Sequence, residues 1–400
     1  MALSVAEALA RILDGVTALA DETVAIAEAD GRTLAAPLAA RITQPPFDAS
    51  AMDGYAVRAA DVATLPARLT VIGSAAAGHP FAGRVAPGEA VRIFTGGALP
   101  DGADAVVIQE NTSADGSTVV VTDGRPDAGH VRRRGFDFAA GDILLDAGRV
   151  LGPRELSLAA AMGHGEVACR RRPRVAVLAT GDELVPPGEQ PGPGQIVCSN
   201  HLGVMGLCRR AGAVTRFLGI ARDTRDSLDR HLADASDADV LVTIGGASVG
   251  DHDLVGPVLR ERGLALDFWK IAMRPGKPLM FGRLGAQRVV GLPGNPVSAL
   301  ICTRIFVVPL MRALLGQPAS LDALTSMRAG APIEANGPRQ HYMRATVRRG
   351  GDGVDVAVPA RSQDSSLLSP LAEANAFIVR PPEAPAVPAG SPVEVLRLDF

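Results

Sequence analysis

Short apolar runs alternate with glycine-rich polar turns through the middle of this 400-residue chain. Residues 175–179 (VAVLA), 238–244 (ADVLVTI) and 289–292 (VVGL) each have the length of a buried strand. Helical patterns at residues 201–211 and 227–235 separate them. This alternation predicts a doubly wound, mostly parallel α/β sheet with helices on both faces. Ligands bind such sheets at the carboxyl ends of the strands, in the loops that lead into the helices.

The segments that flank this α/β region show different patterns. Ser4 and Glu7 form a capping-box pattern ahead of an amphipathic helix. Alternating runs at residues 69–121 predict a small β domain inserted into another domain, and those at residues 323–400 predict a C-terminal β-barrel. The basic segment 170–174 (RRRPR) is the best candidate boundary before the α/β domain. We therefore expect a multidomain chain of class α/β plus β.

Charge and cysteine usage narrow the class of protein. The formal net charge is -3, which argues against a general nucleic-acid binder. Four cysteines without CxxC or zinc spacing fit a reduced intracellular protein. The first 13 residues lack the features of a signal peptide, and no apolar run approaches the ~20 residues that span a bilayer. We expect a soluble, cytoplasmic protein that does not bind membranes.

Polar and charged side chains recur where the predicted strands end. Ser248 and several glycines follow the second run, and two acids follow the first run in TGDEL at residues 180–184. Three cations lie close together further along, namely Lys270, Arg274 and Lys277. Ordinary turns account for any one of these loops, but the set indicates a binding site. The site is neither a dinucleotide fold nor a P-loop, because GxGxxG and GxxxxGK[ST] are both missing.

Three further loops carry clustered polar groups. Asp53 lies in residues 44–58 (QPPFDASAMDGYAVR), which we expect to form an irregular loop that is either a domain hinge or part of a site. Thr95, at a strand end, is either a turn hydroxyl or a site residue. Asp137 lies in residues 132–142 (RRRGFDFAAGD), which are either a solvated face or an anion site.

Seven motifs in fixed order resemble the molybdopterin molybdenumtransferase family, which includes the gephyrin E domain. They span nearly the whole chain and are SAMDGYAVR, TGGALPDGADAVV, TGDEL, GGASVGDHD, FWKIAMRPGKP, GLPGNPVSA and RSQDSSLLSPLAEAN. The resemblance implies the last step of molybdenum cofactor synthesis. In that step molybdate is inserted into the dithiolene of adenylylated molybdopterin, with Mg²⁺-dependent release of AMP.

The resemblance also implies an elongated homodimer with four domains per chain. The expected boundaries are 1–45 with 140–172 for a linking and dimerisation domain, 46–139 for the inserted β domain, 173–317 for the molybdopterin-binding α/β domain and 318–400 for the β-barrel. The site would lie between the α/β domain of one subunit and segments of its partner. The adenylyltransferase and apo-molybdoenzymes are the implied protein partners.

Site roles carry over from the family position by position. Asp53, Thr95 and Asp137 match polar positions expected from the partner subunit. Glu183, Asp223 and Asp253 match acidic catalytic positions, and Glu183 with Asp253 is the expected Mg²⁺ pair. The positions expected to bind molybdate and phosphate are Ser248, Lys270, Arg274, Lys277, Ser298, Arg344 and Ser365. Cations suit oxyanions and carboxylates suit hard Mg²⁺, so we expect electrostatic, metal-assisted catalysis without a covalent enzyme intermediate.

The chain departs from the family pattern at a few positions. Ile244 and Ala247 replace the usual Ser and Val of TSGGVSVG, Cys198 stands where Asp is common, and Arg274 stands where some members have Lys. Two other functions stay open, a molybdopterin adenylyltransferase and a non-catalytic pterin-binding scaffold. Tungstate has nearly the charge and size of molybdate, so either oxyanion fits these residues.

Overall fold

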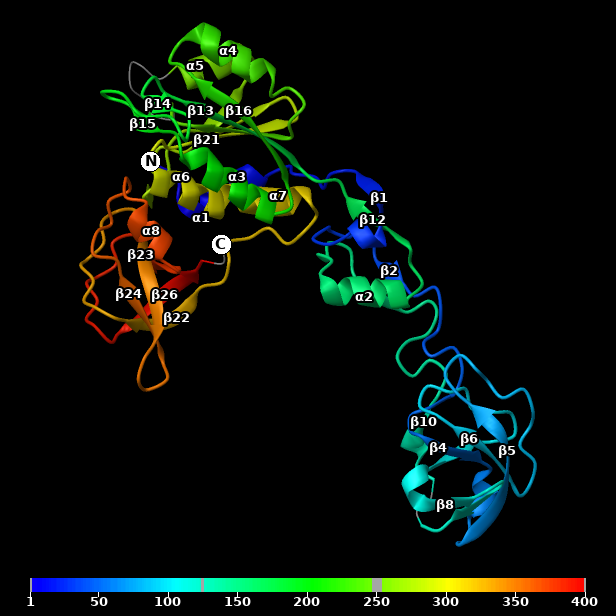
Figure 1. The fold of residues 1–400 in the computed structure, drawn as a ribbon. Coiled ribbons are helices and arrows are strands. Elements are labelled where there is room, and N and C mark those ends of the chain that lie inside the picture. The colour runs from blue at the N-terminus through cyan, green and yellow to red at the C-terminus, as the bar shows by residue number, and fades with distance from the viewer. Residues whose placement is uncertain (1, 124–125, 247–253, 399–400) are drawn as a thin grey trace. The chain divides into compact units, whose positions relative to one another are not determined.

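The chain forms two compact units in the computed structural model, which describes residues 2–123, 126–246 and 254–398 (Figure 1). The larger unit holds Met1–Glu22, Gly31–Ala35 and Cys169–Phe400. The smaller unit holds Thr23–Asp30 and Ala36–Ala168. Each unit is therefore assembled from segments that are far apart in the sequence.

A six-stranded sheet in the order β16-β13-β17-β21-β20-β18 is the centre of the larger unit. The strands β16 (Val214–Ala221), β13 (Arg174–Thr180), β17 (Val240–Ile244) and β21 (Gln287–Leu292) are parallel neighbours. Strand β20 (Met280–Leu284) runs antiparallel to both of its neighbours, β21 and the edge strand β18 (Ala265–Phe268). The central strands are buried on both faces, which explains their continuous apolar sequences. The predicted doubly wound, mostly parallel sheet is confirmed.

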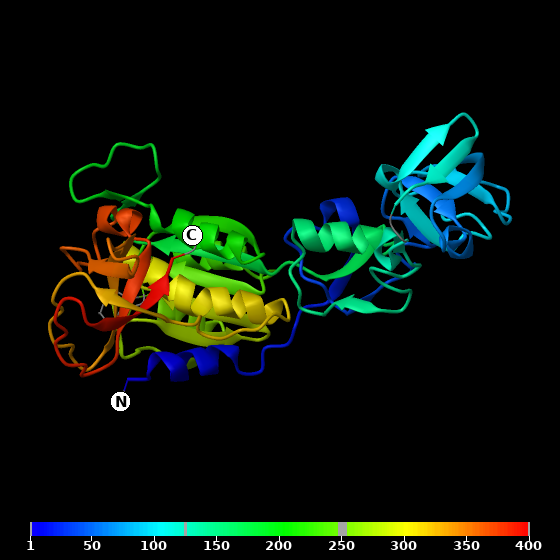
Figure 2. The same cartoon turned by 90° about the horizontal axis from the view of Figure 1, so that it is seen from below.

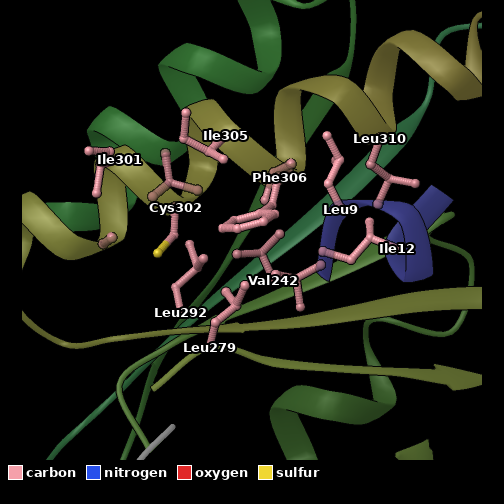
Figure 3. Packing of buried hydrophobic residues seen from close by; sticks show 14 of the residues in the cluster. Leu9, Ile12, Val242, Leu279, Leu292, Ile301, Cys302, Ile305, Phe306 and Leu310 are labelled. Carbon is pink, nitrogen blue, oxygen red and sulfur yellow. The ribbon is translucent and has the colours of Figure 1, made fainter. Parts of the chain in front are cut away.

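Alternate residues of the sheet enter two separate apolar cores. Val177 contributes to a core with α1 (Val5–Leu13) and α3 (Asn200–Arg210), whereas Leu178 contributes to a core with helices α4 and α5 on the opposite face. These two helices are α4 (Arg225–Ala233) and α5 (Val255–Glu261). Figure 3 shows Leu9 and Ile12 of α1 packed beside Leu310 in the first core. The α1 helix and its Ser4–Glu7 capping box are confirmed.

One long helical stretch covers this first face, lying beside α1 (Figure 2). It consists of α6 (Pro296–Cys302), the π-helical turn η5 (Thr303–Val307) and α7 (Val308–Leu314). The stretch has 19 residues and a mean hydropathy of 1.8, so the expectation of no apolar run near this length was wrong. It is 83% buried, and its Arg304 and Arg312 both pair with Asp322, so it is a core helix.

The C-terminal segment forms a closed five-stranded barrel, as predicted. Its strands are β22 (Thr325–Ala329), β23 (Gln340–Arg349), β24 (Asp355–Pro359), β25 (Ala376–Arg380) and β26 (Pro392–Arg397), and the pairing of β23 with β25 closes the ring. The short strand β19 (Met273–Arg274) adds to β23, and α8 (Ser369–Glu373) follows the loop after β24. Tyr342 and Phe377 point out of the barrel into the first core of the α/β sheet, which joins the two parts.

The smaller unit contains the predicted β domain as a six-stranded sheet in the order β7-β4-β6-β5-β9-β8. The strands are β4 (Gly54–Val57), β5 (Ala67–Ala75), β6 (Glu89–Ile93), β7 (Ala105–Ile108), β8 (Thr112–Asp115) and β9 (Thr118–Val121). The prediction that residues 44–58 are an irregular loop was wrong for β4, whose four residues are all buried. A Cβ on Gly54 would lie 1.9 Å from the Val107 carbonyl oxygen, so glycine permits this close pairing.

The remaining elements are short. Helix α2 spans Pro153–Ala161 and begins with its proline. Two small antiparallel ladders join β2 (Leu38–Ala39) to β11 (Ile143–Leu145) and β3 (Ala49–Ser50) to β10 (Val131–Arg132). The chain passes between the units near β1 (Asp21–Ala25), η1 (Ile26–Glu28) and β12 (Glu166–Arg170). Leu34 makes an isolated antiparallel bridge to Cys169. Short 3₁₀ turns are η2 (Ala59–Val62), η3 (Gln109–Asn111) and η4 (Ala128–His130).

Candidate functional site

A cavity of about 800 Å³ lies at the carboxyl ends of the parallel strands of the larger unit. This is the edge at which open α/β sheets bind ligands. The wall is built from the loops after β13, β16, β17 and β21, from the small ladder of β14 (Leu184–Val185) with β15 (Ile196–Val197), and from the barrel loop. Its polar lining residues are Thr180, Glu183, Cys198, Ser199, Asn200, Asp223, Asn295 and Ser366.

Glycines hold the strand ends together at the floor of the cavity. The N–H of Gly181 donates to the Ala221 carbonyl at 3.1 Å, and the N–H of Gly245 donates to the Leu292 carbonyl at 3.1 Å. Gly245 has a φ of +90°, and a Cβ there would lie 2.7 Å from the Thr180 carbonyl oxygen. Only glycine therefore allows the chain to turn at this point without a steric clash.

Glu183, one of the predicted site residues, is an exposed residue of the cavity wall. Its carboxylate folds back over Gly181, where a Cβ would lie 2.4 Å from Oε2 of Glu183. Gly181 also has a φ of +148°. The glycine thus leaves the space that the carboxylate occupies, and the TGDEL motif sets the direction of its own acid.

Asp223 lines the same cavity, so the structure brings together two acids that are 40 positions apart. The N–H of Asp223 donates to Oδ1 of Asp182 at 3.1 Å, and Nη1 of Arg222 donates to the Asp182 carbonyl at 2.8 Å. Asp182 therefore positions the turn that carries Asp223. Sequence reasoning missed Asp182, although it is the first acid of the TGDEL motif.

Cys198 is a buried part of the cavity wall and lies 3.4 Å, sulfur to Nδ1, from His201. Burial, and then the negative charge of Glu183, raise the pKa of the Cys198 thiol. Burial also lowers the pKa of His201, whose ring stacks on Phe217 with centroids 4.0 Å apart. Both groups are therefore neutral at neutral pH. Cys198 thus places an uncharged thiol at the position where Asp, common in the family, would place a negative charge.

Asparagines connect the start of α6 to its neighbours. Nδ2 of Asn200 donates to the Gly294 carbonyl at 2.7 Å, and Nδ2 of Asn295 donates to Oγ of Ser365 at 3.0 Å. Ser365 also accepts the N–H of Val297 with its carbonyl at 3.1 Å. Ser199, the N-cap residue of α3, makes no side-chain hydrogen bond to the helix, and Asn200 joins the start of α3 to the loop before α6.

The predicted cations differ in their placement. Lys270, Arg274 and Lys277 are all exposed. Lys277 precedes Pro278, which lines the cavity, and its carbonyl accepts the N–H groups of Ile271 and Leu279. Arg274 lies on β19, directly opposite His341 of the barrel. Of the three, Lys277 is the one that its neighbours in the chain place beside the cavity.

Arg344 and Ser298 lie behind the cavity wall. Arg344 is 1% exposed, and its guanidinium donates to the carbonyls of Ser362, Asp364 and Leu367 at 2.8–2.9 Å. It therefore fixes the loop that carries Ser365 and Ser366. Ser298 is buried within α6. Direct contact of either residue with substrate stays a prediction.

Two predicted site residues, Ser248 and Asp253, lie outside the described residues, as does Ala247. The described ranges contain no group of three or more acidic, histidine or cysteine side chains arranged to hold a metal. Glu183 and Asp223 are carboxylates at the cavity wall, and carboxylate oxygens are the donors that hard Mg²⁺ prefers. The donor chemistry of the wall therefore fits Mg²⁺.

The smaller unit holds the other three predicted site residues. Oδ1 of Asp53 accepts the N–H of Thr95 at 2.7 Å and its hydroxyl at 2.8 Å, although the two residues are 42 positions apart. These two hydrogen bonds, the backbone one first, lower the pKa of Asp53, and Arg92 adds to the effect. Asp137 is exposed on a turn and donates its N–H to the Gln44 carbonyl at 3.0 Å. The structure thus joins Asp53 to Thr95.

Comparisons with known proteins agree with this fold and site. The MoeA N-terminal region (domain I and II) matches residues 3–163, a probable molybdopterin binding domain matches residues 176–313, and the MoeA C-terminal region (domain IV) matches residues 326–398. A molybdopterin molybdenumtransferase from Haemophilus influenzae is 36% identical over 381 residues, which cover 94% of this chain and 93% of that protein. Molybdopterin molybdenumtransferase 1 from Mycobacterium tuberculosis is 35% identical over 421 residues, with 99% of each covered.

A comparison with solved structures indicates the same family. A molybdopterin biosynthesis MoeA protein from Pyrococcus horikoshii has a TM-score of 0.86 to this chain at 32% identity, and the match covers 100% of both chains. The fold and the strand-end cavity define a chain of the molybdopterin-binding α/β class with added β domains. The chain belongs to the MoeA family of molybdopterin molybdenumtransferases, as its motifs predicted.

Proposed function

We propose that this chain is a molybdopterin molybdenumtransferase that inserts molybdate into the dithiolene of adenylylated molybdopterin and releases AMP. The observation that carries this proposal is the cavity of about 800 Å³ at the carboxyl ends of β13, β16, β17 and β21. Its volume lies within the range of sites that hold cofactor-sized ligands. The family names place the chain at the molybdenum insertion step of cofactor biosynthesis.

Both substrates, adenylylated molybdopterin and molybdate, are anions, and the cavity wall offers neutral polar groups and a nearby cation to bind them. The glycine turns after β13 and β17 bring backbone close to the cavity, and Asn200, Asn295 and Ser366 offer neutral polar atoms around it. Lys277, beside Pro278, supplies positive charge near this wall. Molybdate is a dianion, so a cation at this position favours its capture. These groups hold and orient adenylylated molybdopterin and molybdate.

Glu183, with Asp223 at the same wall, is the residue we assign to hold Mg²⁺, and Asp253 is its predicted companion. When bound, Mg²⁺ supplies charge neutralisation at the phosphate as the bond to AMP breaks. Cys198 is kept as a neutral thiol by burial and by Glu183, so it does not act as a nucleophile. The wall therefore acts by electrostatic positioning, without a covalent enzyme intermediate.

The protein works as a cytoplasmic homodimer in which Asp53, Thr95 and Asp137 of one subunit complete the cavity of the other. The four-domain division stated from the sequence belongs to this proposal, as do the adenylyltransferase and apo-molybdoenzymes as partners. The support is the Asp53–Thr95 pair, which holds an ionised carboxylate at a strand end of the smaller unit.

Supplying the substrate in two forms tests the reaction. The purified protein receives either molybdopterin with ATP or adenylylated molybdopterin with molybdate, and active cofactor is measured by reconstitution of an apo-molybdoenzyme. We expect cofactor only from the second mixture, without ATP consumption. ATP consumption in the first mixture would instead identify an adenylyltransferase. Tight binding of the adenylate without turnover would identify a pterin-binding scaffold.

A further inference from the structure

One end of the C-terminal barrel carries a row of cations. His341 of β23 pairs directly with Arg274 of β19 on one side and with Arg380 of β25 on the other. Residues that pair across neighbouring strands project from the same face, so these three side chains form a row. Arg339 comes two residues before His341 in the sequence, just before β23, and its charge is one of those that lower the pKa of His341.

The row covers the end of the barrel interior. Ala345 and Val347, further along β23, and Ile378 of β25 alternate in step with the row and belong to the apolar core inside the barrel. His341 and Arg380 are each only 7% exposed. Arg274 is exposed and Arg339 is partly buried. The side chains of His341 and Arg380 are therefore buried, while those of Arg274 and Arg339 reach solvent.

No ion pair within the described residues neutralises the arginines of this cluster. Among the ion pairs of the described residues, none is made by Arg274, Arg339 or Arg380. Arg380 donates one N–H to the Pro385 carbonyl, but its Nε is buried and has no hydrogen-bond partner in the described part of the chain. An unpartnered buried donor of a charged group is costly unless something binds it.

The backbone around the cluster is fixed. Nδ2 of Asn336 donates to the Arg339 carbonyl at 2.8 Å and to the Arg380 carbonyl at 3.2 Å. Asn336 thus holds the backbone of Arg339 close to the backbone of Arg380. Burial first, and then the charges of Arg274, Arg339, Arg344 and Arg380, lower the pKa of His341 to about 4. The imidazole is neutral at neutral pH and offers one N–H donor.

We propose that this end of the barrel is a binding site for a tetrahedral oxyanion of the phosphate type, held between Arg339 and Arg380 with Arg274 and His341 at its sides. Guanidinium groups bind phosphate oxygens in a two-pronged geometry, and the unpartnered Nε of Arg380 supplies a donor that such an anion satisfies. The described lining of the strand-end cavity contains none of the four residues. The inference does not rest on the proposed activity.

The imidazole resonances of the protein give a local test. Inorganic phosphate is titrated at pH 7 and constant ionic strength, with chloride as the balancing anion, and the His341 signal is assigned by its loss in His341→Gln. We expect a saturable shift of this signal, and Arg339→Gln should weaken the apparent phosphate affinity roughly tenfold. Arg339 is partly exposed, so this variant is expected to fold.

Arg348→Gln is the matched control, because Arg348 is an exposed arginine at the far end of the same strand. It removes the same charge and should leave phosphate affinity unchanged. A second titration with glycerol phosphate separates free phosphate from a phosphomonoester as the ligand, and saturation by either anion supports the site. A His341 signal that responds to neither anion, or equal weakening by Arg339→Gln and Arg348→Gln, would overturn the proposal.

Discussion

At the scale of single residues, Gly181 controls the direction of the Glu183 carboxylate. Its φ is +148°, and a Cβ at this position would lie only 2.4 Å from Oε2 of Glu183, so only glycine fits here. Gly181→Ala should turn this carboxylate away and reduce the rate of AMP release roughly 100-fold, because small displacements of catalytic groups have large effects. The measurement is the steady-state rate of AMP release.

Gly188→Ala provides the control for backbone strain. Gly188 also has a positive φ, +94°, but a Cβ there meets no atom within 4 Å. Both variants should lose about 1 kcal/mol of unfolding free energy from the positive φ. Only Gly181→Ala should lose activity, and equal activities of the two variants would remove Glu183 from its assigned role.

The Asp53–Thr95 pair gives a prediction about pH. Two hydrogen bonds from Thr95 lower the pKa of Asp53, so the ionised pair is favoured above the unfolded pKa and is lost as pH falls through the folded pKa. Thr95→Val removes the hydroxyl and keeps the N–H, so the pKa of Asp53 should rise toward its ordinary value. Carboxyl NMR titration measures this change. Thr122→Val, whose hydroxyl donates to the Asn111 carbonyl, should leave the pKa of Asp53 unchanged.

At the scale of elements, Asp239 fastens the segment before β13 to the start of β17. Its carboxylate accepts two N–H groups of Arg171 at 2.8 and 2.9 Å and the N–H of Arg174 at 2.7 Å. Burial alone would raise the pKa of Asp239, but these hydrogen bonds outweigh burial and lower it. Asp239→Asn should cost about 1–3 kcal/mol of unfolding free energy at pH 7.

The pH dependence of unfolding checks the cause of that loss. A carboxylate with a lowered pKa stabilises the fold above its unfolded pKa, and the contribution disappears as pH falls through the lower folded pKa. The difference between the original protein and Asp239→Asn should therefore shrink below about pH 4. The surface variant Glu189→Gln should show no difference at any pH. A difference that stays constant down to acid pH would contradict the electrostatic explanation.

The elements that the sequence predicted best were those with the strongest periodic signal. β13, β17 and β21 are apolar runs because both sheet faces are buried, and their parallel order placed the acids of two separate motifs, Glu183 and Asp223, at one edge. β4 was missed because its four residues lie within a segment rich in Pro, Asp and Ser, whose composition is typical of a loop. Burial of that strand depends on neighbours far along the chain.

Some parts of the site could not be read from spacing. Asp182 and Asn200 act through hydrogen bonds to other loops, and such pairings depend on how the loops meet in space. Arg344 was predicted to bind an oxyanion because its position matches one expected to bind molybdate and phosphate in the family. The structure buries it among three carbonyls, where it shapes the loop that carries Ser366. Its support of the loop could not be read from the sequence, and its direct contact with substrate stays a prediction.

At the scale of the whole molecule, the predicted site residues fall in two separate units. Glu183 and Asp223 belong to the larger unit, while Asp53, Thr95 and Asp137 belong to the smaller unit. If the partner subunit completes each site, chains with Asp53→Ala and chains with Glu183→Gln should complement each other. Co-expressed in equal amounts, they should give about one quarter of the original activity, because half of the dimers are mixed and each has one intact site.

Each variant alone supplies the control for this mixture and should be inactive. AMP release by tandem-tagged mixed dimers, purified through both tags, measures the complementation directly. Inactive mixed dimers would show that both residues act within one subunit.

The central claim is that this chain couples molybdate insertion to AMP release. The most direct measurement is the rate of AMP release from purified adenylylated molybdopterin with Mg²⁺, in the presence and absence of molybdate. We predict release that depends on molybdate, that is lost on chelation of Mg²⁺, and that yields cofactor able to reconstitute an apo-molybdoenzyme. AMP release at the same rate without molybdate, or tight binding without release, would contradict the account.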